Sequence, residues 1–306
     1  MTETTTLFDD PHWPRAGRWP GADALAASDR VDVAVIGVPT WRTSLSATGA
    51  HATPAAVRAA IQRYGTFADG GAWPSVVDFG DVAEPDGDGE VDAIEAVRAA
   101  ASRSSLVVAI GGDNALTYSV AHGAWAGRIG DAGLITIDAH HDLRDGVSNG
   151  SPVRRLLADG LDGRRVAQLG IADFANSAFY DERARDAGIR IVRRDEFEAT
   201  GLQQIATEAL AVAGASGGPI HVDVDVDACD RAVAPACPAS VPGGLSAYQL
   251  RRTVRLLARD PRVTSLDIAE VDATRDASDG RTVRLAALVV LEAIAGFAER
   301  PVATED

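Results

Sequence analysis

The chain has 306 residues, a hydrophobic share of 46% and a formal net charge of −15. This length suits one large α/β domain or two smaller ones, and no Pro/Ser-rich linker divides it, which favours one domain. The negative charge argues against nucleic acid or acidic membranes as partners, because both attract clustered Lys and Arg. Its two cysteines, Cys229 and Cys237, fit a reducing compartment better than a disulfide scaffold. No signal sequence or membrane-spanning run is visible, so we expect a cytoplasmic protein.

Residues 1–30 contain three Pro and two Trp without hydrophobic periodicity, and we expect them to form an irregular N-terminal arm. Residues 31–306 are expected to form a single domain, in which short apolar runs alternate with helical segments. The predicted strands are 31–37, 75–81, 105–113, 133–142, 166–172, 189–195, 218–227 and 263–272. The predicted helices are 91–102, 115–125, 151–161, 177–188, 201–214, 246–260 and 281–299, with a further one that begins at Thr53-Pro54. This alternation predicts a parallel sheet that is covered on both faces.

Two short acidic runs carry the strongest functional signal. The first, Asp138-Ala139-His140-His141-Asp142, follows LITI, and the second, Asp223-Val224-Asp225-Val226-Asp227, follows GPIHV. In an extended strand, side chains at i, i+2 and i+4 point to the same face, so each run would gather its acidic side chains. Carboxylates on a mostly apolar strand need a countercharge, which a pair of divalent metal ions would supply. The alternative is that these residues are turn and capping aspartates at strand ends.

Further candidates also follow predicted strands. Gly111-Gly112-Asp113-Asn114 comes after one strand, and Glu270 lies at the end of another. Ligands of open parallel sheets bind beyond the carboxyl ends of the strands, so these side chains and the two acidic runs should meet. Oxygen ligands with few imidazoles suit Mn²⁺ or Mg²⁺ better than a metal that prefers thiolates. We therefore assign Cys229 to packing rather than to the metal site.

Three blocks resemble the signature motifs of the ureohydrolases, the family of arginases, agmatinases, guanidinobutyrases and formiminoglutamases. They are IGGDN (110–114), DAHHD (138–142) and DVDACDRAVAPACPASVPGGLS (225–246), and the resemblance extends to VVDFGD (76–81), NGSPVR (149–154) and SLDIAEVD (265–272). The resemblance implies a three-layer α/β/α fold with a central, mostly parallel sheet. It also implies a homo-oligomer, a trimer or hexamer, with two Mn²⁺ ions per subunit that a hydroxide bridges.

The resemblance also implies roles for individual residues. Asp138 and Asp225 resemble the carboxylates that bridge both ions. Asp142 resembles a ligand that also transfers a proton, and Glu270 resembles the carboxylate that orients the nitrogens of the substrate. The implied metal ligands are Asn114, Asp138, His140, Asp142, Asp225 and Asp227.

Two asparagines depart from the commonest pattern of the family. Asn114 stands where most members have a metal-binding His, and an amide oxygen is a weaker donor, so one of the two metal sites should be weak. Asn149 stands where arginases and agmatinases tend to have a His. Both departures resemble formiminoglutamases, which hydrolyse N-formimino-L-glutamate to L-glutamate and formamide in histidine degradation. The alternatives are an agmatinase or guanidinobutyrase that releases urea, and a metal-poor paralogue without catalytic activity.

The substrate of a formiminoglutamase carries two carboxylates, which need local cations in this acidic protein. Arg144 and Arg154 are the candidates, and we group them with Asn149 and Glu270 as substrate-binding residues. Two alternatives stay open: a surface salt bridge between Arg144 and Asp145, and a solvated helix face for Arg154.

Overall fold

The computed structural model describes residues 10–26, 28–69 and 71–301, which contain an eight-stranded sheet. The strands are β1 (Val31–Val38), β2 (Val76–Asp81), β3 (Ser104–Gly111), β4 (Gly133–Ile137), β5 (Val166–Ile171), β6 (Arg190–Arg193), β7 (Ile220–Asp225) and β8 (Val263–Ala269). Their spatial order is β2-β1-β3-β8-β7-β4-β5-β6, and every pair is parallel. All eight predicted strands are present, and the predicted mostly parallel sheet is parallel throughout.

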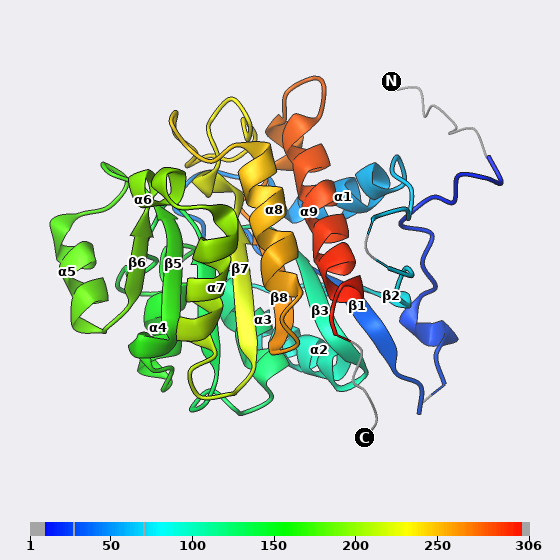
Figure 1. Cartoon of the computed structure of the whole chain (residues 1–306), viewed down its shortest axis with the longest axis horizontal. Helices are drawn as coiled ribbons and strands as arrows, with labels where there is room; N and C mark the ends of the chain where they lie inside the picture. The colour runs from blue at the N-terminus through cyan, green and yellow to red at the C-terminus, as the bar shows by residue number, and fades with distance from the viewer. Residues whose placement is uncertain (1–9, 27, 70, 302–306) are drawn as a thin grey trace.

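Helices cover both faces of the sheet, as the alternation of strands and helices predicts. They are α1 (Thr53–Ile61), α2 (Glu90–Ser102), α3 (Leu116–Trp125), α4 (Pro152–Ala158), α5 (Ala178–Asp186), α6 (Arg194–Ala199), α7 (Leu202–Ala213), α8 (Ala247–Ala258) and α9 (Arg281–Ala298). One face is covered by α1, α7, α8 and α9, and the other by α2, α3, α4 and α5 (Figure 1). This arrangement confirms the three-layer α/β/α fold. No helix of the described residues is long and apolar enough to cross a membrane.

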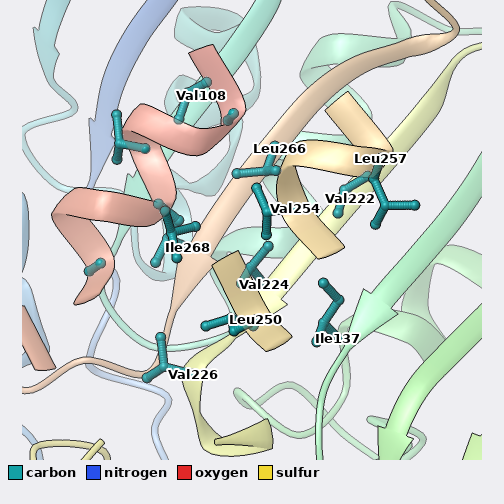
Figure 2. Close-up of a cluster of buried hydrophobic side chains, with 14 of the residues drawn as sticks. Val108, Ile137, Val222, Val224, Val226, Leu250, Val254, Leu257, Leu266 and Ile268 are labelled. Atoms are coloured by element: carbon teal, nitrogen blue, oxygen red, sulfur yellow. The ribbon is translucent and has the colours of Figure 1, made fainter. Parts of the chain in front are cut away.

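Apolar side chains of the central strands form the largest core cluster. In Figure 2, Val222 and Val224 of β7 and Leu266 of β8 face Leu250 and Val254 of α8. These strands are buried on both sides, which explains why their sequences are almost continuously apolar. The polar residues within and just after them are therefore exceptions that require an explanation.

Both acidic runs leave the sheet earlier than predicted. The predicted strand 133–142 ends at Ile137, because the Asp138 carboxylate accepts a hydrogen bond from the backbone N–H of His140 at 2.6 Å and so closes a turn. The predicted strand 218–227 ends at Asp225, whose carboxylate caps a 3₁₀ turn, Val226–Ala228, through the N–H of Asp227. The shared-face argument from strand alternation is therefore wrong for the residues beyond these two strand ends.

Smaller differences from the predicted elements lie elsewhere. The predicted strand 263–272 ends at Ala269, before Glu270, and the predicted helix 151–161 spans Pro152–Ala158. The predicted strand 189–195 ends at Arg193, because residues 194–199 form the short helix α6, which the sequence did not predict. The described part of the N-terminal arm contains one 3₁₀ turn, Ala22–Ala24, and pairs through single bridges with Gly65 and Asp78.

Candidate metal centre

The four central strands of the sheet deliver polar residues to one edge. Strands β3, β8, β7 and β4 are neighbours in this order. Asn114 follows β3, Glu270 follows β8, Asp225 ends β7, and Asp138 follows β4. The backbone N–H of Glu270 donates to the carbonyl oxygen of Gly112, which ties the ends of β8 and β3 together at 2.9 Å. Residues far apart in sequence therefore meet at the carboxyl edge, where parallel sheets bind ligands.

Asp138, His140 and Asp227 form the first cluster, which we call the imidazole group. One ligand atom from each lies within 4.8 Å of those of the other two. His140 Nδ1 lies 2.7 Å from Asp227 Oδ2 and 3.5 Å from Asp138 Oδ1. The N–H of Ala139 donates to the second Asp227 oxygen at 3.0 Å. The imidazole group thus contains an imidazole and a backbone N–H that contact its carboxylates.

Asp138, Asp142 and Asp223 form the second cluster, the carboxylate group, and the same 4.8 Å limit applies to one oxygen of each. All three side chains are buried. Asp138 Oδ2 and both oxygens of Asp223 receive no hydrogen bond from the described residues. Asp142 has a left-handed backbone, with φ of 53°, which is rare outside glycine and turns its side chain back to the cluster. Three buried carboxylates this close together need a countercharge.

The pKa values of three carboxylates in the site are raised, which indicates a lack of positive charge around them. Burial, followed by the nearby Asp227 carboxylate, raises the pKa of Asp138 to about 7. Burial and neighbouring carboxylates also raise the pKa values of Asp142 and Asp225 well above their usual range. The Asp227 carboxylate raises the pKa of His140 to about 12. Burial acts to raise the pKa of Asp227, but His140 and the N–H of Ala139 lower it overall.

A divalent cation fits these residues. Buried carboxylate oxygens without hydrogen bonds and a single adjoining imidazole match the ligand preference of Mn²⁺ or Mg²⁺. Cys237 lies within 4.8 Å of Asp225 and Asp227, and both Cys237 and Cys229 are buried thiols whose pKa values burial raises, that of Cys229 to about 12. Because Mn²⁺ and Mg²⁺ prefer oxygen to sulfur ligands, we assign the site to the carboxylates and His140.

Asn114 is placed beside the carboxylate group, although its amide oxygen is engaged elsewhere. Its Oδ1 accepts a hydrogen bond from the Thr117 hydroxyl at 2.8 Å, and its Nδ2 donates to Asp142 Oδ2. Its Nδ2, and not its Oδ1, is therefore the amide atom that contacts Asp142. The predicted role of Asn114 as a metal ligand stays a prediction.

A cavity of about 300 Å³ reaches this centre. Its lining combines predicted metal ligands and predicted substrate-binding residues with the exposed loop residue Leu45. The predicted residues that line it are His140, Asp142, Arg144, Asn149, Asp225 and Glu270. Metal ligands and substrate-binding candidates therefore border one space.

Glu270 is held rigidly at this cavity. Its Oε1 accepts two hydrogen bonds, from the N–H of Asn114 at 2.9 Å and from Asn149 Nδ2 at 2.7 Å. The other amide atom of Asn149, Oδ1, accepts the N–H of Leu45 at 3.0 Å. Glu270 also has a left-handed backbone, with φ of 63°. Asn149 therefore positions Glu270, while no described residue donates a hydrogen bond to Glu270 Oε2.

The two candidate arginines differ in their surroundings. Arg144 is exposed and lines the cavity, and the predicted alternative of an Arg144–Asp145 salt bridge is wrong, because Asp145 pairs with Arg183 at 2.9 Å. Arg154 does not line this cavity, and its guanidinium donates to the carbonyl oxygens of Arg144 and Gly146. This geometry favours a role for Arg154 in bracing the loop over direct contact with the substrate.

Sequence reasoning assigned no individual role to Asp223 or to the polar residues beside it. Asp223 of β7 lies in register with Asp267 of β8. Asp267 Oδ2 is 3.0 Å from His221 Nε2, and His221 Nδ1 is 2.8 Å from the Ser265 hydroxyl. The alternating Asp residues after GPIH were the available signal for Asp223, whereas the pairing of His221 with Asp267 depends on strand order.

Comparison with known proteins places the chain in a family. The model of the arginase family matches residues 31–296. A formimidoylglutamase from Bacillus subtilis is 33% identical over 304 residues, covering 92% of this chain and 92% of the relative. A formimidoylglutamase from Halobacterium salinarum is 34% identical over 281 residues, covering 88% of this chain and 89% of the relative.

Solved structures agree with this placement. The crystal structure of formimidoylglutamase from Bacillus subtilis superposes with a TM-score of 0.89 at 30% identity, covering 99% of this chain and 97% of that one. Proclavaminate amidino hydrolase from Streptomyces clavuligerus superposes with a TM-score of 0.80 at 26% identity, covering 94% and 97% of the two chains. Sequence and fold together show that the chain belongs to the arginase family.

Proposed function

We propose that this protein is a formimidoylglutamase, which hydrolyses N-formimino-L-glutamate to L-glutamate and formamide in histidine degradation. Its family makes it a hydrolase that acts on a C–N bond of a linear amidine, and the 33% identical formimidoylglutamases cover nearly its whole length. The observation that carries the choice of substrate is the cavity that links the carboxylate cluster to the guanidinium of Arg144. Such a cavity suits a substrate with a cationic amidine at one end and carboxylates at the other.

The cofactor in this proposal is a pair of Mn²⁺ ions. Asp138, His140, Asp225 and Asp227 would hold one ion, and Asn114, Asp138, Asp142 and Asp225 would hold the other, weaker one. The support is the set of buried, unpaired carboxylate oxygens and the manganese named with a structurally similar formiminoglutamase from Trypanosoma cruzi, which is 25% identical. A bound pair of this kind lowers the pKa of water and so supplies a nucleophile at neutral pH.

The residues of the chain orient the substrate and move its protons. Glu270 Oε2 accepts a hydrogen bond from an amidine nitrogen, since Oε1 is already saturated by Asn114 and Asn149. Asp142 lines the same cavity, accepts a proton from the attacking water and passes it to the leaving nitrogen. Asn149 acts through Glu270, because both ends of its amide are engaged.

Product identification tests the proposed function. Mn²⁺-loaded protein is incubated separately with N-formimino-L-glutamate, agmatine, guanidinobutyrate and arginine. We expect formamide from the first substrate and no urea from the others. Urea release from agmatine or guanidinobutyrate without formamide release would assign the chain to a guanidine hydrolase. No product from any substrate would support a non-catalytic paralogue.

Replacing Arg144 tests the basis for the choice of substrate. For Arg144→Ala we expect a 10–100-fold rise in KM for N-formimino-L-glutamate, with kcat nearly unchanged, because a hydrogen bond to a charged group contributes about 1.5–3 kcal/mol. Arg164→Ala is the matched control, since Arg164 is exposed and pairs with Asp162 outside the cavity. An unchanged KM in Arg144→Ala would show that another residue binds the carboxylates.

The proposal extends to organisation and location. We propose that residues 31–306 form one domain preceded by the arm, and that the protein is a cytoplasmic homo-oligomer, a trimer or hexamer. Family membership supports the oligomer, and light scattering of the Mn²⁺-loaded protein measures its size.

A further inference from the structure

Asp223 is a buried carboxylate that the proposed mechanism does not use. It lies in the centre of the sheet, between Thr136 of β4 and Asp267 of β8 in the strand register. Its side chain is 0% exposed, and neither of its oxygens receives a hydrogen bond from the described residues. Burying a carboxylate without a partner is costly, so this position needs a countercharge or a proton.

Asp223 is directed at the metal centre. One of its oxygens lies within 4.8 Å of an oxygen of Asp138 and an oxygen of Asp142. Oxygen ligands bind Mn²⁺-like cations at about 2.0–2.6 Å, so two ligands of one ion can lie up to about 5 Å apart. The three carboxylates therefore fit around a single ion. Asp138 Oδ2 also lacks a hydrogen bond from the described residues. A cation between Asp138 and Asp223 would therefore supply a partner to both side chains.

Asp267, the neighbour on the other side, has a partner at one of its two oxygens. Asp267 accepts from His221 at 3.0 Å, and His221 is held in turn by Ser265 at 2.8 Å. Both carboxylates are fully buried, but His221 lies within hydrogen-bond distance of Asp267 and not of Asp223.

We propose that Asp223 is a ligand of the divalent ion that the carboxylate group would hold, in addition to Asp138 and Asp142. Asn114 offers its Nδ2 to Asp142 while its Oδ1 accepts from Thr117, so its amide is a weak ligand for this ion. Asp223 supplies a further, charged oxygen from β7, the strand beside β4. The inference deepens the proposed function and rests on it only in requiring a divalent ion at this centre.

The test is a Mn²⁺ titration of the full-length Asp223→Asn variant by calorimetry, with electron paramagnetic resonance to count bound ions. Asn matches Asp in shape but removes the charge. We expect one ion to bind as in the wild type and the other to bind at least about 100-fold more weakly, since even outer-shell changes cost 10–100-fold in metal affinity. Wild-type binding of both ions by Asp223→Asn would overturn the proposal.

Asp267→Asn is the matched control, because it makes the same isosteric change at an equally buried position one strand away. We expect Asp267→Asn to keep both ions within a few-fold of the wild-type affinities. If it loses the same ion as Asp223→Asn, the effect comes from the buried charge of the sheet and not from ligation, and the proposal is wrong.

A rescue experiment separates ligation from stability. Adding Asn114→His to Asp223→Asn should restore much of the lost affinity, because the imidazole adds a ligand to the same ion. A folding defect would not be repaired in this way. If Asp223→Asn does not fold, Asp223→Ser, which is smaller and can still donate to Asp267, replaces it in both titrations, with the same results expected.

The readout also separates this inference from the proposed function. A wild-type protein that binds two Mn²⁺ ions but releases no formamide would contradict the substrate assignment and leave the role of Asp223 intact. A wild-type protein that releases formamide, with an Asp223→Asn variant that binds both ions normally, would contradict the role of Asp223 alone.

Discussion

The imidazole group and the carboxylate group share Asp138, yet they meet its charge in different ways. In the imidazole group, His140 lies 2.7 Å from Asp227, and Asp227 also accepts a backbone N–H. In the carboxylate group, Asp142 accepts from Asn114 Nδ2, and Asp138 Oδ1 accepts from the N–H of His140. The other oxygen of Asp138 and both oxygens of Asp223 receive no hydrogen bond from the described residues. The protein therefore supplies partners for most of the first group and leaves three carboxylate oxygens of the second unpaired.

This difference should affect how each half of the centre binds a metal ion. A metal ion that enters the imidazole group must displace the His140 proton, which the Asp227 carboxylate holds with a pKa of about 12. A metal ion that enters the carboxylate group relieves repulsion between buried carboxylates, but it gains no imidazole ligand. The two halves of one centre should therefore be distinguishable by stoichiometry, by affinity and by pH.

The largest effect should come from the residue that both groups share. For Asp138→Ala we expect loss of both Mn²⁺ ions and of formamide release, because one ligand is removed from each group. Asp225→Ala should behave in the same way if Asp225 bridges the ions as predicted. Metal content after dialysis and activity are the measurements, and Asp159→Ala, a partly exposed carboxylate that pairs with His122, is the control. A variant that retains one tightly bound ion would show that Asp138 serves only one group.

A smaller effect is expected from making the two halves alike. As isolated, the protein should hold about one Mn²⁺ per chain and approach two at high Mn²⁺, because the carboxylate group lacks an imidazole. Asn114→His should tighten the weaker site by about 10–100-fold, the range that ligand tuning produces. Calorimetric titration of both proteins is the measurement. Equal and tight binding of two ions by the wild type would remove the argument that Asn114 weakens a site.

Much of the fold could be predicted from the sequence, because strands buried on both faces have nearly continuous apolar runs. GLITI and the apolar residues of GPIHVDVD mark β4 and β7 directly. The ends of these strands were misplaced because Asp138 and Asp225 are compatible with both a strand and a turn. Their side-chain hydrogen bonds to the backbone two residues ahead decide for the turn. Hydrophobic periodicity carries no information about these side-chain hydrogen bonds.

The sequence predicted that Asp138, His140, Asp142 and Asp227 meet at one place, but it did not predict the contacts that support the site. The motifs locate Asp142 and Glu270, since their spacing is local. The link from Glu270 through Asn149 to Leu45 joins residues 121 and 104 positions apart, and no local pattern reports it. The approach of Asp223 to Asp142 depends on the placement of β7 beside β4, which follows from strand order and not from composition. Contacts of this kind, between residues far apart in the sequence, cannot be predicted from local patterns.

The smallest expected effect is a pH-dependent difference in stability between metal-free and Mn²⁺-loaded protein. The folded pKa of Asp138 is about 7 and lies above the ordinary value of 3.8, so the metal-free folded state keeps a proton that the unfolded chain releases above about pH 4. Its stability should therefore fall as pH rises from 5 to 7. His140, with a folded pKa of about 12 against 6.5, acts in the same direction, because its contribution is complete below 6.5 and declines above it. The lowered pKa of Asp227 acts only at acidic pH, below this range.

Bound Mn²⁺ displaces these protons, so the melting temperature of the loaded protein should depend less on pH. We expect the difference in melting temperature between loaded and metal-free protein to widen by several degrees from pH 5 to pH 8, measured by calorimetry. Asp113→Asn is the control, because the pKa of Asp113 is also raised by burial to about 7 although Asp113 belongs to neither group. In Asp113→Asn, the melting temperatures of the loaded and the metal-free protein should both depend less on pH. The difference between the two should still widen from pH 5 to pH 8. Parallel pH profiles for loaded and metal-free wild type would mean that the buried carboxylates do not hold these protons, and that the two halves of the centre are equally satisfied without metal.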